Sequence, residues 1–393
     1  MFRISVAGLC ENEKLRESGR QIERADASAR KKDSIFGIMS RSPLKLLLCA
    51  FAALLSLACV RDEESEAFGG RDCIRVLMDP SGIGDGGYND LIYTGAVEIW
   101  YRYGGKFPVS IATPDDFQQA REIVLQWLRE IDKENEGVHL IVFASSVYEP
   151  LCLEVAQRLD TQDVELLLFE SDYSGELPVH CFSVSLYGAS YASGALAREA
   201  GVLSPALIMS NVFDAGIAEG AEGFRAGFAA DSLECIYLSE QKGGGYDLSF
   251  EAYAACSSLV QSHDFLFPIA GGSNSGVYRF LRENPKGVFT VGMDSDKSLE
   301  CSAVMMSVIK RMDLLVADVL RGWIEKGSLP DGEVYGLRSG YVQCVLSPNY
   351  EEWLEPYYEK CLKEGMLQED EYMSVHQDAY RSARLRPAAC CLL

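Results

Sequence analysis

Hydrophobic positions along the chain follow two alternating patterns, one typical of buried strands and one typical of amphipathic helices. The clearest helical pattern covers residues 114–134, where apolar residues recur every three or four positions. Short apolar runs bounded by turn residues predict buried strands at residues 75–78, 109–112, 139–144 and 165–170. Strands that alternate with helices in this way predict a parallel sheet with helices on both faces, which is an α/β fold.

A second series with the same alternation begins near residue 206. Its predicted strands are residues 206–210, 235–238, 265–270 and 288–294, with helix-like segments between them. Two series of this length predict two similar lobes rather than one barrel. Beyond them we expect one more strand, a helix and an acidic, helix-prone tail.

The N-terminal region ends in an apolar run that is typical of an exported protein. Lys45 precedes a nearly unbroken apolar run over residues 46–58, and Cys59 follows it. That length suits the core of a signal peptide and is short for a bilayer span. A single transmembrane anchor remains the alternative.

The end of this run resembles a bacterial lipobox. Residues 55–59 read LSLAC, with the small Ala58 just before the cysteine that would carry the lipid. We therefore predict a signal region over residues 1–58, with Met39 as the true initiator because the residues before it are unlike a signal-peptide start. Residues 59–72 would form a tether from the lipid to the folded part.

Negative charge is concentrated in the part of the chain after the apolar run. The whole chain has a net charge of −22, and residues 59–393 carry 26 basic and 52 acidic residues. A surface this acidic repels phosphate backbones. We therefore exclude nucleic acid as a partner.

Metal and catalytic patterns are missing from the sequence. The four histidines stand in no metal spacing, the cysteines have no CxxC spacing, and GxSxG does not occur. Asp294 and Asp296 would share a face if one strand ran through both, so a glycosidase-like carboxylate pair stays open. We expect no metal, no cofactor and a binding protein rather than an enzyme.

The stretch from Arg75 to Asp90 has the strongest candidate chemistry. An apolar strand delivers Asp79 to its carboxyl end, a loop with four glycines follows, and Tyr88 precedes a helix that begins near Asn89. Ligands of open α/β sheets lie beyond the carboxyl ends of the strands. We therefore expect Asp79 and Tyr88 to face one ligand.

Two other interpretations of this loop remain open. Residues 82–87 fit the GxGxxG pattern of dinucleotide sites, but residues 101–113 lack the acidic residue that such a site requires about twenty positions on. A plain strand-to-helix turn with a capping aspartate would also explain the glycines.

Three later stretches also place polar or aromatic residues at predicted strand ends or flexible turns. Residues 267–276 end a strand with a glycine pair and begin a helix, and the strand over residues 288–294 ends at Asp294. Lys310 follows a further strand-like run, and Tyr246 comes after three glycines.

These motifs together resemble the basic membrane protein (BMP) family of ABC-transporter substrate-binding lipoproteins, whose best-understood members are purine nucleoside receptors. The resemblance covers roughly residues 73–345. The matching positions are Asp79, Asp85, Tyr88 and Asn89 in the opening pattern, Ala270, Gly271 and Gly272 in the AGG turn, residues 292–297 in GxDxDQ, and Ser307, Lys310 and Asp313 in S-x-x-K-x-x-D. Lys297 replaces the usual glutamine of that third motif.

The resemblance implies a type I periplasmic-binding-protein fold, with two doubly wound lobes, three crossovers and a ligand cleft between the lobes. The first lobe would comprise residues 73–185 and about 305–335. The second lobe would comprise residues 186–304 and about 336–366. Residues 367–393 would be a poorly ordered tail.

The resemblance also implies a role for each candidate residue. Tyr88 and Tyr246, which stand where nucleoside receptors prefer phenylalanine, would stack on a purine ring. Asp79 would accept hydrogen bonds from base N–H groups, and Asn89, which follows Tyr88 in the motif, would also contact the ligand. Asp294 would accept hydrogen bonds from ribose hydroxyls, Lys310 would donate to ribose oxygens, and Gly272 would supply backbone contacts.

The implied function is that of a receptor anchored to the bacterial cell envelope through Cys59, facing the periplasm or the exterior. It would bind a purine nucleoside or a similar small solute and pass it to an ABC permease. Alternatives are a sensor lipoprotein of the same fold, a nucleoside hydrolase, and a surface lipoprotein with a degenerate cleft.

Overall fold

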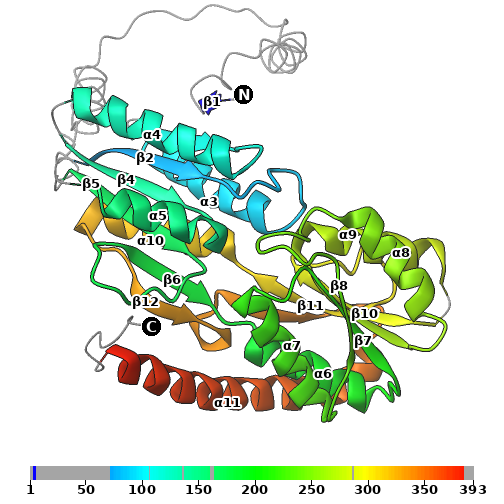
Figure 1. Cartoon of the computed structure of the whole chain (residues 1–393). Coiled ribbons are helices and arrows are strands. Elements are labelled where there is room, and N and C mark those ends of the chain that lie inside the picture. The colour runs from blue at the N-terminus through cyan, green and yellow to red at the C-terminus, as the bar shows by residue number, and fades with distance from the viewer. Residues whose placement is uncertain are drawn as a thin grey trace, which may run out of the picture.

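The computed structural model describes residues 3–5, 71–105, 107–134, 137–159, 163–285 and 287–384 (Figure 1). Met39, the apolar run and Cys59 lie outside the described residues, so the signal region and lipid anchor stay predictions. Within the described ranges, no helix is both long enough and apolar enough to cross a membrane.

Two separate sheets organise the chain, and all but two of their strands are parallel. The first sheet has the order β1-β3-β2-β4-β5-β6-β12, and only β1 is antiparallel to its neighbour. Its strands are β1 (Arg3–Ser5), β2 (Arg71–Leu77), β3 (Val109–Ala112), β4 (Val138–Phe143), β5 (Val164–Phe169), β6 (His180–Val184) and β12 (Asp331–Tyr335).

The second sheet has the order β13-β11-β10-β9-β7-β8, with β13 antiparallel at one edge. Its strands are β7 (Pro205–Met209), β8 (Glu234–Tyr237), β9 (Phe265–Ile269), β10 (Phe289–Asp294), β11 (Val304–Lys310) and β13 (Val342–Leu346). Each sheet forms one lobe with the helices that cover it, and the predicted α/β fold is confirmed.

Helices cover both faces of each sheet (Figure 1). In the first lobe, α3 (Tyr88–Arg102) and α10 (Met312–Lys326) pack together on one face, with α4 (Phe117–Glu134) and α5 (Glu149–Ala156) on the other. In the second lobe, α6 (Tyr187–Glu199), α7 (Ala215–Phe228) and α11 (Glu351–Arg384) lie on one face, with α8 (Ser249–Leu259) and α9 (Asn274–Glu283) on the other. Short 3-10 helices are η2 (Ser146–Tyr148), η3 (Gly271–Ser273) and η4 (Leu337–Ser339).

Successive side chains of a strand point to opposite faces of the sheet, which explains why helices are needed on both faces. Leu140 and Val142 of β4 belong to the core beneath α3 and α10, whereas Ile141 and Phe143 belong to the core beneath α4 and α5. All four side chains are fully buried. Because burying each contributes about 1.5–3 kcal/mol, neither face of this strand could be left in water.

The chain crosses between the lobes three times, after β6, after β11 and after β12. Strand β11 pairs with β10 and β13, so residues 304–310 belong to the second lobe. Our sequence assignment placed residues from about 305 in the first lobe and is corrected here. An apolar run shows that a strand exists but does not show which sheet it joins, because pairing partners lie far away in sequence.

The C-terminal helix also differs from expectation. Helix α11 continues to Arg384, across residues that we assigned to a poorly ordered tail. Glu369 on this helix is 1% exposed and accepts hydrogen bonds from the backbone N–H groups of Gly188 (3.2 Å) and Leu337 (2.8 Å). These two residues follow the first and third crossovers, so α11 ties two of the three connections together.

We predict that the Glu369 carboxyl makes the free energy of unfolding depend on pH. Burial raises its pKa to about 7, above the ordinary value of 4.5 that holds in the unfolded chain. A raised carboxyl pKa favours folding below about pH 4.5, and this contribution is lost as pH rises to about 7. Glu369→Gln has no carboxyl at this position and should not lose this contribution as pH rises. The free energy of unfolding of the variant minus that of the wild type should therefore increase by roughly 3 kcal/mol between about pH 4.5 and about pH 7.

Urea unfolding at pH values between 4.5 and 7.5 measures this difference. The exposed Glu371 on the same helix provides the matched control, Glu371→Gln, which should follow the wild type. A constant difference between Glu369→Gln and the wild type at all pH values would contradict the prediction.

Candidate functional site

A cavity of about 300 Å³ lies between the two lobes, at the carboxyl ends of their parallel strands. Strand β2 is flanked by β3 and β4, and β7 is flanked by β8 and β9, so both sheets have their topological switch point here. The residues that we predicted to contact a ligand all line this cavity: Asp79, Tyr88, Asn89, Tyr246, Gly272, Asp294 and Lys310. The structure therefore brings them together, while their contact with a ligand stays a prediction.

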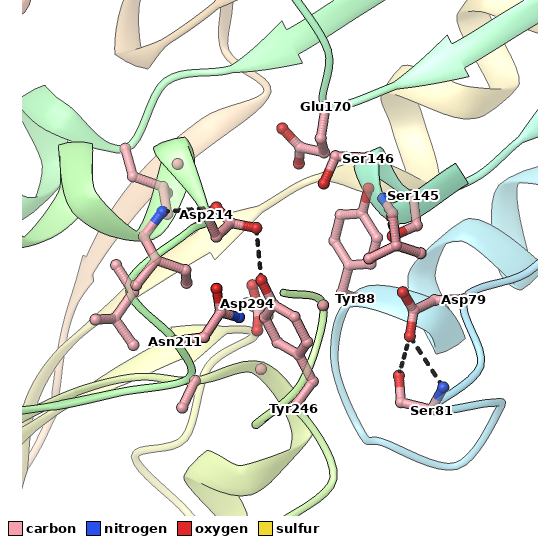
Figure 2. A pocket seen from close by; sticks show the side chains of 18 of the residues that line it. Asp79, Ser81, Tyr88, Ser145, Ser146, Glu170, Asn211, Asp214, Tyr246 and Asp294 are labelled. Carbon is pink, nitrogen blue, oxygen red and sulfur yellow. Dashed lines mark hydrogen bonds between the residues drawn. The ribbon is translucent and has the colours of Figure 1, made fainter. Parts of the chain in front are cut away.

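The first lobe supplies a hydrogen-bonded relay beneath the cavity. Oδ1 of Asp79 accepts from the backbone N–H (2.9 Å) and the hydroxyl (2.6 Å) of Ser81, as Figure 2 shows. The Ser81 hydroxyl oxygen in turn accepts from Nδ2 of Asn89 at 3.0 Å. Both Asp79 and Asn89 are buried, so the relay holds the Asp79 carboxylate in one orientation.

The glycine-rich loop between β2 and α3 is held by two carboxylates of the chain itself. Asp85 accepts from the backbone N–H groups of Gly87 (2.9 Å) and Asn89 (2.9 Å), the second of which lies in the first turn of α3. Asp90 accepts from those of Gly84 (2.7 Å) and Gly86 (2.9 Å). These amides are therefore not open to a pyrophosphate, and the dinucleotide interpretation of GIGDGG loses its physical basis.

Tyr88 stands at the start of α3 and faces the cavity from the first lobe (Figure 2). Its hydroxyl oxygen is buried, and no described residue gives it a hydrogen bond. Burial, together with the charge of Glu170, raises the pKa of this phenol well above its ordinary value. The hydroxyl therefore stays protonated and keeps a hydrogen to donate.

Tyr246 faces the same cavity from the second lobe (Figure 2). Its hydroxyl donates to Oδ2 of Asp214 at 2.5 Å, and Oδ1 of Asp214 caps α7 by accepting from the N–H of Ile217. A Cβ added at Gly272 would lie 3.0 Å from the carbonyl oxygen of Tyr246. The glycine thus lets η3 approach the backbone of Tyr246, and the hydrogen bond to Asp214 holds the ring in place.

Asp294 and Lys310 end neighbouring strands of the second lobe. Asp294 has a left-handed backbone, with φ 66°, an uncommon conformation that clusters at ligand sites. Burial raises the pKa of its carboxyl, and the Lys310 ammonium opposes that shift. Lys310 Nζ also lies 5.3 Å from the centre of the Tyr88 ring, so it links the charged and aromatic parts of the cavity.

Glu170 is a functional candidate that the sequence analysis missed. It follows β5 in the first lobe with φ 55°, lines the cavity and pairs with Lys310 across the lobes at 2.9 Å. Its other carboxylate oxygen accepts from the N–H of Val184 at 3.0 Å. In the sequence, the sign that could have identified Glu170 is its position at the end of an apolar run.

The lobes also touch beside the cavity. The carbonyl oxygen of Gly86 accepts from the Ser295 hydroxyl (3.0 Å) and from Lys297 Nζ (2.9 Å). A Cβ on Gly87 would lie 3.2 Å from Cβ of Asp294. Lys297, which replaces the family's glutamine, is therefore used to join the glycine-rich loop to the second lobe.

Acidic groups outnumber basic groups in the lining of the cavity. The lining also includes Ser81, Asn211, Asp214 and Glu219, which the sequence analysis missed. Seven carboxylates face two lysines there: Asp79, Asp85, Glu170, Asp172, Asp214, Glu219 and Asp294 against Lys242 and Lys310. Such a lining suits a ligand that is rich in hydrogen-bond donors and opposes an anionic one.

The cavity shows neither a metal site nor the proposed carboxylate pair. Among the described residues, no three His, Cys, Asp or Glu side chains are placed to hold a metal ion. Asp296 is not part of the lining and instead accepts from the Ser307 hydroxyl at 3.2 Å and the Ser298 N–H at 2.9 Å. Strand β10 ends at Asp294, so the two aspartates do not share a strand face, and the expectation of an Asp294–Asp296 carboxylate pair on one strand is wrong.

Solved structures show which fold the chain shares. An ABC-transporter solute-binding protein from Aeropyrum pernix is 17% identical with a TM-score of 0.57, covering 80% of this chain and 89% of that one. A carbohydrate-transporter solute-binding protein from Agrobacterium radiobacter, in complex with D-arabinose, is 15% identical with a TM-score of 0.53, covering 74% and 99%. These similarities confirm the type I periplasmic-binding-protein fold.

Curated relatives come from Borreliella burgdorferi. Basic membrane protein D is 27% identical over 36% of this chain, a stretch that spans only 43% of that protein. Basic membrane protein C is 20% identical over 76% of this chain and 86% of its own length. The family model described as "Bmp: ABC transporter substrate-binding protein PnrA-like" matches residues 75–370. The chain therefore belongs to the Bmp family of PnrA-like ABC-transporter substrate-binding proteins.

Proposed function

We propose that the protein is a lipid-anchored receptor that binds a purine nucleoside between its lobes and delivers it to an ABC permease. One observation carries the proposal: Tyr88 and Tyr246, from opposite lobes, line the same cavity as Asp79 and Asp294. Aromatic rings provide flat apolar surface for a base, and carboxylates accept from its N–H groups and from sugar hydroxyls. A nucleoside combines both kinds of group.

The proposed pose assigns one end of the cavity to the base and the other to the sugar. The base lies by the two tyrosine rings with its polar edge at Asp79, and the ribose lies by Asp294 and Lys310. Lys310 is already held by Glu170, so it can donate to a ribose oxygen without being reoriented. Each hydrogen bond to a charged group contributes about 1.5–3 kcal/mol.

Ligand binding would favour the closed arrangement of the lobes, because only there can both lobes contact the ligand. The bonds from Ser295 and Lys297 to Gly86 cross the same gap and support that arrangement. The three crossovers provide the hinge. Closure would then be the state that the permease recognises.

The cavity charge predicts which ligands bind. We expect guanosine, inosine or adenosine to release measurable heat in titration calorimetry. The corresponding 5′-monophosphates should bind at least about tenfold more weakly, since seven carboxylates repel a phosphate. D-Ribose alone should bind weakly because it lacks the aromatic part. Absence of heat and of thermal stabilisation with every nucleoside would reject this ligand class, and tight D-ribose binding would indicate a sugar receptor.

Removal of the Asp294 carboxylate should weaken nucleoside binding. We expect Asp294→Ala to raise Kd by roughly ten- to a hundredfold, the loss of about two charged hydrogen bonds, and Asp294→Asn to lie between the two. The exposed Asp231 of the same lobe provides the control, Asp231→Ala, which should leave Kd unchanged. Equal Kd values for Asp294→Ala and the wild type would remove Asp294 from the site.

The lipid anchor requires a separate test. We expect the mature protein to begin at Cys59, to carry a diacylglyceryl group on its sulfur and to fractionate with membranes, whereas Cys59→Ser should lose the lipid. Intact mass of the mature protein measures this directly. A mature protein with a free thiol at Cys59 would contradict the anchor and leave the binding proposal untouched.

A further inference from the structure

We infer that closure of the two lobes takes up one proton at the hinge, on a pair of carboxyl groups formed by Glu219 and Glu369. These residues belong to two helices of the second lobe, α7 and α11, which both pack against α6 (Figure 1). The coupling concerns how the lobes move, so it holds for any small ligand that the closed form binds.

Ser185 connects this carboxyl pair to the first lobe. Its backbone N–H donates to the carbonyl oxygen of Tyr335 at 2.9 Å, which continues the pairing of β6 with β12. Its hydroxyl donates to Oε1 of Glu219 in the second lobe and also interacts with the carboxyl of Glu369. Because the backbone of Ser185 follows one lobe and its hydroxyl is bound to the other, rotation of the lobes changes its position relative to both carboxyls.

Two glycines make room for the Glu369 side chain between the crossovers. A Cβ at Gly336, in the third crossover, would overlap with Oε2 of Glu369. A Cβ at Gly188, just after the first crossover, would lie 2.8 Å from Cβ of Glu369. The crossovers themselves therefore bury this carboxyl, and a hinge rotation that moves them apart admits water to it.

The surroundings of the pair do not neutralise two negative charges. In the described part of the chain, the donors to both carboxyls are backbone N–H groups and the Ser185 hydroxyl, and no lysine or arginine pairs with either. The other titratable groups that face the pair are Glu170, Arg338, Cys344 and Tyr372. Arg338 is already paired with Asp370 at 2.6 Å. Two anions in one buried cluster repel each other, so the closed hinge favours binding of a proton.

Glu369 is the member of the pair that holds this proton. Burial, together with the charge of Glu219, raises the pKa of Glu369 to about 7. Burial also raises the pKa of Glu219, but three donors to its Oε1 oppose that shift and favour its anion. Access of water in the open form brings the pKa of Glu369 back toward its ordinary value of 4.5. Protonation therefore favours closure at low pH, and this contribution is lost as pH rises to about 7.

Small-angle X-ray scattering of the ligand-free protein between about pH 5 and about pH 8 tests the coupling without any ligand. We expect the radius of gyration to increase with pH as the closed form is lost. Glu369→Gln is uncharged at every pH, so it should keep the smaller radius throughout. The exposed Glu371 provides the matched control, Glu371→Gln, which should follow the wild type.

A radius that is the same at both ends of this pH range in the wild type would overturn the inference. An equal increase in Glu369→Gln would also overturn it, because another group would then be responsible. Thermal unfolding checks that each variant folds. Should Glu369→Gln fail to fold, the pH dependence of the wild-type radius still decides.

Titration calorimetry with guanosine, in buffers of different ionisation enthalpy, counts the proton directly. At about pH 6, we expect the wild type to take up roughly half a proton more per bound guanosine than Glu369→Gln does. From about pH 5 to about pH 8, its Kd should rise at least about threefold relative to that of the variant. Equal proton uptake by the two proteins would contradict the coupling while the nucleoside proposal stands. If no nucleoside binds, the proposed function fails, and the scattering measurement still decides on the hinge.

Discussion

All parallel strands of a sheet end at the same edge, and here the carboxyl edges of two such sheets face one cavity. This constraint brings together residues that are far apart in sequence. Asp79 follows β2, Glu170 follows β5, and Asp294 ends β10, yet all three line the same space. The cleft is therefore a direct result of winding two α/β lobes from one chain and crossing between them three times.

The carboxylates in that space divide into those satisfied by the protein and those left open. Asp85 and Asp214 accept from helix N-termini, and Glu170 pairs with Lys310. Asp79 uses one of its oxygens within the chain. Asp294 instead has its pKa raised by burial, and Lys310 opposes the shift. The protein thus orients its acidic groups internally and keeps only a few acceptors for a ligand.

The sequence predicted the fold and much of the cavity lining for the same reason. An apolar run that stops at an aspartate marks a strand end. This pattern is enough to identify Asp79 and Asp294 as candidate ligand-binding residues. Glu170 ends such a run too, but its partner Lys310 lies 140 residues further along the chain, so the sequence gives no sign of the pair. Tyr246 was recognisable from its glycine turn, whereas its bond to Asp214 depends on tertiary packing.

Two other features could not be predicted from local pattern. Strand β11 reads as a strand in either lobe, and only its pairing with β10 and β13 assigns it to the second. Glu369 reads as one acid among many in a polar tail, but packing against the crossovers buries it. Local periodicity records which positions are apolar, and long-range pairing decides which polar positions become buried.

The most direct measurement of the central claim is a crystal structure of the protein grown with guanosine. The account predicts a base between the rings of Tyr88 and Tyr246, with Asp79 at its edge and Asp294 at the ribose. A nucleoside bound outside this cavity, or held by one lobe alone, would contradict it.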